Sequence, residues 1–212
     1  MKEFHDVFEV LGNTGHASVT VDPGTKPIEH APRRVAVTLY KEVKAKLAEL
    51  EKKRIIAKET EPSEWISSMV VVAKPGKIRI CLDPKDLNKA IKHPKYQIPT
   101  LDETLPKLGK LKVFTTLDGK DGFDQIKLDN DSSKLTTFWM PFGRYRYPRK
   151  PFGICSAPKE FESTVHEQLG DLEGVEVLRD DMLVVGYGDT QDEADRNDDE
   201  NLLRLLKRAR EI

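Results

Sequence analysis

Two short apolar runs, VEVL (175–178) and MLVVGY (182–187), flank the tripeptide Arg179-Asp180-Asp181. Runs of this length that are rich in β-branched residues are typical of strands, so this stretch predicts two strands joined by a tight turn. A third run, VFTTL (113–117), predicts another buried strand, and Asp118 follows it directly. Acidic side chains therefore stand at the ends of predicted strands that lie far apart in the sequence.

The patterns on either side of these strands alternate between helix and strand. Apolar residues recur every three or four positions from Thr38 to about Glu59, which predicts a helix. MVVVA (69–73) and IRICL (78–82), on either side of Lys74-Pro75-Gly76-Lys77, predict a hairpin. Helices and antiparallel hairpins without βαβ units predict an α+β fold. Further helices are predicted near 86–92, after the capping boxes Thr100–Glu103 and Thr190–Glu193, and after Ser156-Ala157-Pro158; further strands are predicted at 123–128, 134–139 and 144–147.

The composition fits a folded chain whose charge is distributed unevenly along the sequence. The chain has 212 residues, of which 38% are hydrophobic, so a sizeable core is expected. Its 35 basic and 36 acidic side chains nearly cancel. Residues 26–100 hold 17 basic and 9 acidic side chains, whereas residues 165–212 hold 6 and 14. The basic first half suits a polyanion such as nucleic acid.

Several classes of protein are excluded on sequence grounds. Two cysteines, Cys81 and Cys155, are too few for a disulfide framework or a structural zinc site. The longest purely apolar run, Met69–Ala73, is too short to span a bilayer. The charged N-terminus is not a signal peptide, so we expect a protein without a membrane partner that is not secreted and lies in the cytoplasm or nucleus.

The strand-end carboxylates suggest metal chemistry. Carboxylates close to buried strands repel one another and stay ionised only if cations offset them. Two Mg²⁺ ions, about 3.5–4 Å apart, do this in sites of phosphoryl transfer to a hydroxyl. On the residues alone an alternative stays open, because aspartates are also ordinary turn formers. Asp121 and Asp124 are interpreted as solvated.

Two basic features suggest phosphate binding. Lys74, Lys77 and Arg79 lie in and just after the predicted hairpin turn, where cations are suited to closing over phosphates. The cations between Arg144 and Lys150 alternate with Tyr145 and Tyr147, a pattern that is suited to gripping a nucleic-acid backbone and stacking on bases. An ordinary charged turn and a solvated hairpin face would have the same patterns.

Taken in order, these pieces resemble the reverse transcriptase domain of gypsy-type LTR retrotransposons. The matching blocks span roughly residues 20–212 and include the segment from Thr60 to Phe123, DSSKLTTFWMPFGRYRY (131–147), PFGICSAP (151–158) and DDMLVVGYG (180–188). The resemblance implies the fingers and palm of a right-handed polymerase, with an antiparallel palm sheet packed on helices. Within one such domain, we expect an irregular lead-in at 1–37, mainly fingers at 38–112, and mainly palm at 113–212 with a fingers insertion near 130–150.

The resemblance also implies an activity and its residues. The activity is RNA-directed DNA polymerisation: two-metal transfer of a nucleotide from a dNTP to the 3′-hydroxyl of a primer on an RNA or DNA template, with Mg²⁺, or Mn²⁺ in its place. Phe123 falls at the aromatic position under the incoming sugar, where it would exclude a 2′-hydroxyl. Catalytic and metal-binding roles fall on Asp118, Asp180 and Asp181, and nucleotide-binding roles on Lys74, Lys77, Arg79, Phe123, Phe152 and Gly153.

The chain also departs from the family pattern. Leu178 and Arg179 precede the paired aspartates in place of a tyrosine and an apolar residue, and the turn KPGK (74–77) is one residue shorter than usual. The family's polymerase continues into a thumb, RNase H and integrase, so other parts of a Pol polyprotein are expected partners and the thumb is expected to be absent. A catalytically dead relic that only binds nucleic acid is the alternative, and a metal-dependent nuclease is a third reading.

Overall fold

The computed structural model describes residues 2–9, 11–92, 111–178 and 181–212. The chain forms two compact units. Unit 1 comprises residues 1–15, 95–125 and 158–212, and unit 2 comprises residues 16–94 and 126–157.

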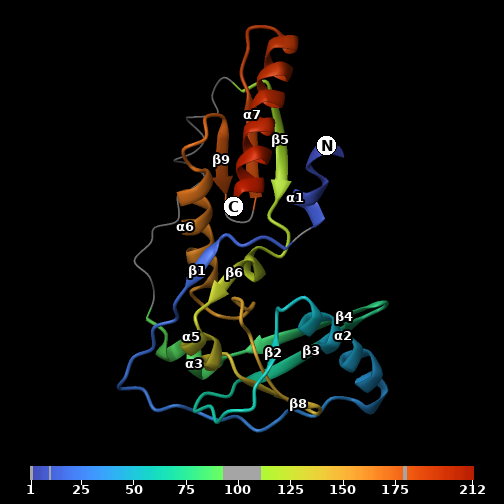
Figure 1. Ribbon diagram of the computed structural model, residues 1–212, viewed down its shortest axis with the longest axis vertical. Coiled ribbons are helices and arrows are strands. Elements are labelled where there is room, and N and C mark those ends of the chain that lie inside the picture. The colour runs from blue at the N-terminus through green and yellow to red at the C-terminus, as the bar shows by residue number, and fades with distance from the viewer. Residues whose placement is uncertain (1, 10, 93–110, 179–180) are drawn as a thin grey trace. The chain divides into compact units, whose positions relative to one another are not determined.

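Unit 1 is built on a three-stranded antiparallel sheet. Its order is β5 (Val113–Asp118), β10 (Asp181–Gly186) and β9 (Val175–Leu178). The strands expected at 113–117, 175–178 and 182–187 are thereby confirmed, the last with a shift of one residue. Helix α7 (Gln191–Glu211) runs along one face of this sheet (Figure 1). This sheet and the antiparallel strand pairs of unit 2 confirm the predicted α+β class with antiparallel hairpins.

Helix α7 begins at the predicted capping box. The Thr190 side chain accepts a hydrogen bond from the Glu193 N–H, and the Glu193 carboxylate accepts from the Thr190 N–H. These hydrogen bonds hold the pKa of Glu193 below its ordinary value. Gly186 lets the helix approach β10 closely, because a Cβ there would lie 2.3 Å from the Ala194 carbonyl oxygen. The Thr115 hydroxyl donates to Asp198 of α7 at 2.7 Å, which identifies the face of β5 that the helix covers.

The remaining helices of unit 1 include two short ones in the stretch expected to be irregular. These are η1 (Lys2–Phe4) and α1 (His5–Glu9). Phe4 is buried and lies under the Arg210 guanidinium at 4.4 Å, and Arg210 donates twice to the Asp6 carboxylate at 2.8 Å. This link to the end of α7 gives the N-terminal segment a defined structure. Within the described part of unit 1, the other helices are α6 (Ala157–Leu169), which has the predicted buried face of Phe161, Val165 and Leu169, and η4 (Gly122–Gln125).

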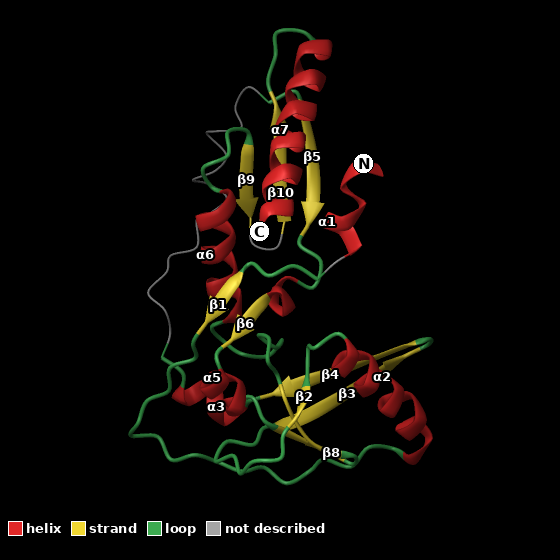
Figure 2. Cartoon of the chain, viewed as in Figure 1, coloured by secondary structure: helices red, strands yellow, loops and turns green. Residues whose placement is uncertain are grey.

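Unit 2 contains the predicted hairpin. Strands β3 (Ser68–Lys74) and β4 (Lys77–Asp83) pair in register, with Lys74 opposite Lys77 and Pro75-Gly76 as the turn. Pro75 favours φ near −65°, and Gly76 has φ 71°, which is the pattern of a type II turn. Helix α2 packs against β4 (Figure 2).

Helix α2 spans Tyr40–Lys52, so the helix expected as far as Glu59 is shorter than predicted. It is preceded by the short η2 (Val37–Leu39). Arg54 adopts a left-handed conformation with φ 56°, which ends helical geometry and turns Ile55 and Ile56 into the core. Helix α3 (Lys85–Ala90) follows β4, close to where a helix was expected at 86–92.

The rest of unit 2 differs from expectation at two predicted strands. Residues 123–128 form η4 followed by the short β6 (Ile126–Leu128), and residues 134–139 begin inside α5 (Asn130–Leu135). The Asp129 carboxylate accepts from the Ser132 N–H at 2.7 Å and caps α5, so local capping overrides the alternating pattern. The other strands are β1 (Gly15–Ala17), paired with β6, and the sheet β2 (Ala57–Lys58), β8 (Gly143–Arg146), β7 (Phe138–Met140).

The capping box expected at Thr100–Glu103 lies outside the described residues. No helix in the part of the chain that the structure describes is long and apolar enough to cross a membrane.

Candidate active site

Asp118 and Asp181 lie directly opposite each other in the sheet of unit 1. Asp118 is the last residue of β5 and Asp181 is the first of β10, and the strand register pairs them. Opposed residues of neighbouring strands point to the same face. Because Thr115 contacts α7, Asp118 lies on the other face of β5, where Phe114 is 58% exposed. The structure thus brings two of the three predicted catalytic carboxylates together, whereas Asp180 lies outside the described residues.

Without a bound cation, the negative charges of the opposed Asp118 and Asp181 side chains repel each other. Directly opposed residues have Cβ atoms about 4.5–5.5 Å apart, and like charges at that distance destabilise a sheet. Both carboxylates are exposed, and among the described residues neither accepts a hydrogen bond nor forms an ion pair. Free carboxylate oxygens at this spacing suit a hard divalent cation such as Mg²⁺. Within the described ranges, no group of three or more His, Cys, Asp or Glu residues could hold a metal ion. Those ranges do not include Asp180.

Phe123 follows the strand end in η4 and packs against α6. Its ring meets that of Phe161 edge to face, with centroids 5.7 Å apart. Gly122 permits this contact, because a Cβ at position 122 would lie 2.5 Å from the buried Phe161 ring. Unit 1 therefore holds the Phe123 ring against α6, and its role under an incoming sugar stays a prediction.

The three predicted phosphate-binding cations share one face of the hairpin in unit 2. Lys74 is opposite Lys77, and Arg79 follows Lys77 by two residues along β4. Side chains two residues apart on a strand point to the same side. All three are exposed, and within the described parts of the chain none of them forms a hydrogen bond or ion pair. Their charges are therefore available to a ligand.

Phe152 and Gly153 lie in a loop of unit 2 that is held by a residue the sequence did not single out. The Asn88 amide donates to the Gly153 carbonyl at 2.8 Å and accepts from the Cys155 N–H at 2.9 Å. Asn88 belongs to the short helix α3, and a single polar residue in a short helix gives no pattern from which this contact could be predicted. Gly153 has φ 109°, a conformation that strongly favours glycine.

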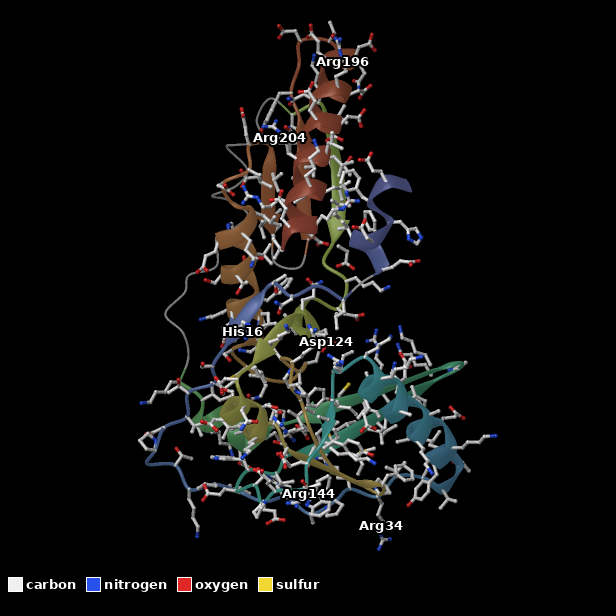
Figure 3. The ribbon with its side chains drawn as sticks, viewed as in Figure 1. His16, Arg34, Asp124, Arg144, Arg196 and Arg204 are labelled. Carbon is white, nitrogen blue, oxygen red and sulfur yellow. The ribbon has the colours of Figure 1, made fainter. Side chains whose placement is uncertain are left out.

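The stretch from Arg144 to Lys150 does not offer the stacking surface that its alternation suggested. Tyr145 and Tyr147 are buried against Phe138, and burial raises the pKa of Tyr145. The guanidinium of Arg146 pairs with the buried Glu59 carboxylate at 3.1 Å, and Lys150 is completely buried. Arg144, labelled in Figure 3, lies over the Trp139 ring at 5.4 Å. Most of these aromatic and basic side chains therefore serve the core of unit 2.

Comparisons with known proteins agree on one family. The family model "Reverse transcriptase (RNA-dependent DNA polymerase)" matches residues 56–210. The chain is 32% identical over 154 residues to the retrovirus-related Pol polyprotein from transposon 412 of Drosophila melanogaster, covering 68% of this chain and 12% of that protein. It is 33% identical over 174 residues to the Pol polyprotein from transposon 297 of the same organism, covering 80% of this chain and 16% of that protein. The chain thus spans a small part of these relatives.

Two solved structures of viral proteins align with this chain. A foamy viral protease–reverse transcriptase in complex with double-stranded DNA aligns with a TM-score of 0.77 at 21% identity, covering 99% of this chain and 44% of that one. The same kind of protein in complex with an RNA/DNA hybrid aligns with a TM-score of 0.73 at 22% identity, covering 92% of this chain and 25% of that one. At 21% and 22% sequence identity, these two alignments show a shared fold and nothing further.

Proposed function

The chain belongs to the reverse transcriptase (RNA-dependent DNA polymerase) family, and from this premise we propose that it transfers a deoxynucleotide to a primer 3′-hydroxyl, directed by an RNA or DNA template. In this proposal unit 1 is the palm and unit 2 the fingers. The observation that carries the proposal is the opposition of Asp118 and Asp181 at the exposed end of the sheet in unit 1.

The residues at this position fit a pair of divalent cations. Asp118 and Asp181, together with Asp180, which directly precedes Asp181 in the sequence, would hold two Mg²⁺ ions, and Mn²⁺ shares their preference for oxygen ligands. Such ions activate the attacking hydroxyl and neutralise charge on the triphosphate. The chain's own part is to hold carboxylate oxygens at a fixed spacing on a rigid strand pair, so that little reorganisation is needed when negative charge develops on the oxygens of the reacting phosphate.

The hairpin of unit 2 supplies positive charge for the triphosphate. A charge-assisted hydrogen bond from Arg79 to a phosphate oxygen is about twice as strong as a neutral one. Lys74 and Lys77 lie on the same face, so either ammonium is a candidate for the second contact. In this proposal, these side chains orient the dNTP and stabilise the pyrophosphate as it leaves.

Template direction is the property that tests the proposal. The chain, a primer and four RNA templates that differ in the next base are incubated with each dNTP and Mg²⁺. We expect incorporation of the complementary nucleotide on each template. Degradation of the oligonucleotides without dNTPs would instead indicate a nuclease, and incorporation that ignores the template would contradict the proposal.

Phe123 is expected to select deoxynucleotides. The ring is held by Phe161, so it cannot move aside easily for a 2′-hydroxyl. Replacing it by valine should raise the relative kcat/KM for ribonucleotides by about 10–200-fold, the range that a change of pocket size achieves. The measurement is single-nucleotide incorporation of dCTP against CTP, which differ only in the 2′-hydroxyl. Phe8→Val is the matched control, since this exposed aromatic lies in α1 and has no role in the proposed site, and an equal change in both variants would contradict the role of Phe123.

Arg179 favours a second candidate function, in which the chain binds template without catalysis. This cation is next to Asp180 in the sequence and could compete with Mg²⁺ for the carboxylates. If Arg179 blocks the site, Arg179→Met should gain primer extension while its salt-sensitive template binding stays unchanged. Equal primer extension by the unaltered chain and by Arg179→Met would exclude a block of the site by Arg179.

A further inference from the structure

The Asn88 side chain holds a loop by two hydrogen bonds from one amide group. Its Nδ2 donates to the Gly153 carbonyl oxygen at 2.8 Å, and its Oδ1 accepts from the Cys155 N–H at 2.9 Å. The Cys155 thiol also contacts the Asn88 carbonyl oxygen at 3.7 Å. The amide therefore needs both its donor and its acceptor, a combination that neither Asp nor Ala provides.

Burial of the Phe152 side chain does not fix this loop. The ring is 54% exposed, and the two hydrogen bonds of Asn88 hold the backbone on its C-terminal side. At the next residue the chain takes φ 109°, and a Cβ on Gly153 would lie 2.5 Å from the Leu82 carbonyl oxygen. The loop therefore lies against the end of β4, the strand that carries Arg79.

The helix that presents Asn88, and Asp83 shortly before it, are held by side chains of the segment before α2. Asp86 accepts from the Lys89 ammonium at 2.7 Å and contacts His30 Nε2 at 2.8 Å. Lys89 first and His30 second hold the pKa of Asp86 below its ordinary value. Just before the helix, Arg33 donates to the Asp83 carboxylate at 2.8 Å. The contacts of His30 and Arg33 come from the segment before α2 and give α3 a fixed place from which Asn88 reaches the loop. The Lys89–Asp86 pair, in contrast, lies within α3 itself.

We propose that Asn88 is a positioning residue for nucleotide binding, which keeps Phe152 and Gly153 in place relative to the strand that carries Arg79. The inference rests on the proposed function, because it assigns the loop and Arg79 to the same nucleotide site. Asn88 touches no reacting atom in this account, so its loss changes nucleotide affinity more than the rate of the chemical step.

The test compares Asn88→Ala and Asn88→Asp with the unaltered chain. Two net hydrogen bonds correspond to about a tenfold effect. We therefore expect the KM for dNTP to rise about tenfold in Asn88→Ala, with kcat and template–primer affinity changed less than about twofold. Amide hydrogen exchange at Cys155 should become about tenfold faster because its N–H loses its acceptor. Asn88→Asp keeps that acceptor, so it should protect the Cys155 amide and still raise KM, since its carboxylate repels the Gly153 carbonyl.

Lys89→Ala is the control on the same helix, where an exposed ion pair contributes little. The inference is overturned if the Cys155 amide exchanges at the same rate in Asn88→Ala and Lys89→Ala, or if kcat falls while KM stays constant. Should the unaltered chain incorporate no nucleotide, the proposed function fails. The role in nucleotide binding then fails with it, whereas faster exchange at Cys155 would still show that Asn88 holds the loop.

Discussion

Replacing Asp118 by asparagine is expected to reduce nucleotide incorporation at least about a hundredfold. Asparagine keeps the size of the side chain and removes the charge that would hold a cation opposite Asp181. A catalytic metal contributes several kcal/mol of charge stabilisation, and each 1.4 kcal/mol is worth about tenfold in rate. The measurement is single-nucleotide incorporation on an RNA template at saturating Mg²⁺.

The same substitution should leave the metal-free fold intact or slightly more stable. The opposed carboxylates repel each other without a cation, so removing one charge is expected to stabilise the sheet by about 0.2–1 kcal/mol. Unfolding in urea with EDTA measures this effect. Added Mg²⁺ should stabilise the unaltered chain and not the variant, because a ligand that binds only the folded state shifts unfolding.

Asp121→Asn is the matched control for this pair of measurements. Asp121 is exposed, lies three residues after Asp118 and has φ 51°, a conformation that asparagine also tolerates. It should keep its activity and its response to Mg²⁺. A variant of Asp118 that retains activity, or a loss of equal size at Asp121, would contradict the metal-binding role of the opposed pair.

Replacing Arg79 by glutamine is the second large effect that we expect. Glutamine retains a hydrogen-bond donor and loses the positive charge, so the variant lacks a charge-assisted contact worth about 1.5–3 kcal/mol. The kcat/KM for dNTP should fall about 10–150-fold with unchanged template–primer affinity. Steady-state incorporation against dNTP concentration, with a separate binding titration, measures both quantities.

Lys85→Gln is the control for a general loss of positive charge in unit 2, because Lys85 is an exposed cation just after β4. The variants Lys74→Gln and Lys77→Gln, measured in the same way, decide which lysine completes the contact. A decrease of the same size for Lys85 and Arg79 would indicate a diffuse field and contradict a specific role for Arg79.

Local patterns in the sequence predicted the elements that carry the site. The strand at 175–178, the hairpin around Pro75-Gly76 and the capping box at Thr190 are all confirmed. Each depends on residues that lie within a few positions of one another, such as an alternating run, a turn dipeptide or a reciprocal cap.

Long-range contacts were beyond the reach of these patterns. The register that places Asp118 opposite Asp181 depends on pairing between distant strands. The contact of Asn88 with the loop at Gly153 likewise spans distant residues. The alternation around Tyr145 and Tyr147 suggested an exposed stacking surface, but packing on Phe138 buries both rings. Sequence alternation alone does not tell which face of a hairpin is covered.

Metal-dependent nucleotidyl transfer at Asp118, Asp180 and Asp181 is the central claim. Its most direct test is primer extension on a short RNA template over a titration of Mg²⁺, and then of Mn²⁺, by the chain and by Asp180→Asn. We predict extension that rises with metal concentration and is absent from the variant. Equal extension by Asp180→Asn, or extension by the chain in excess EDTA, would contradict the account.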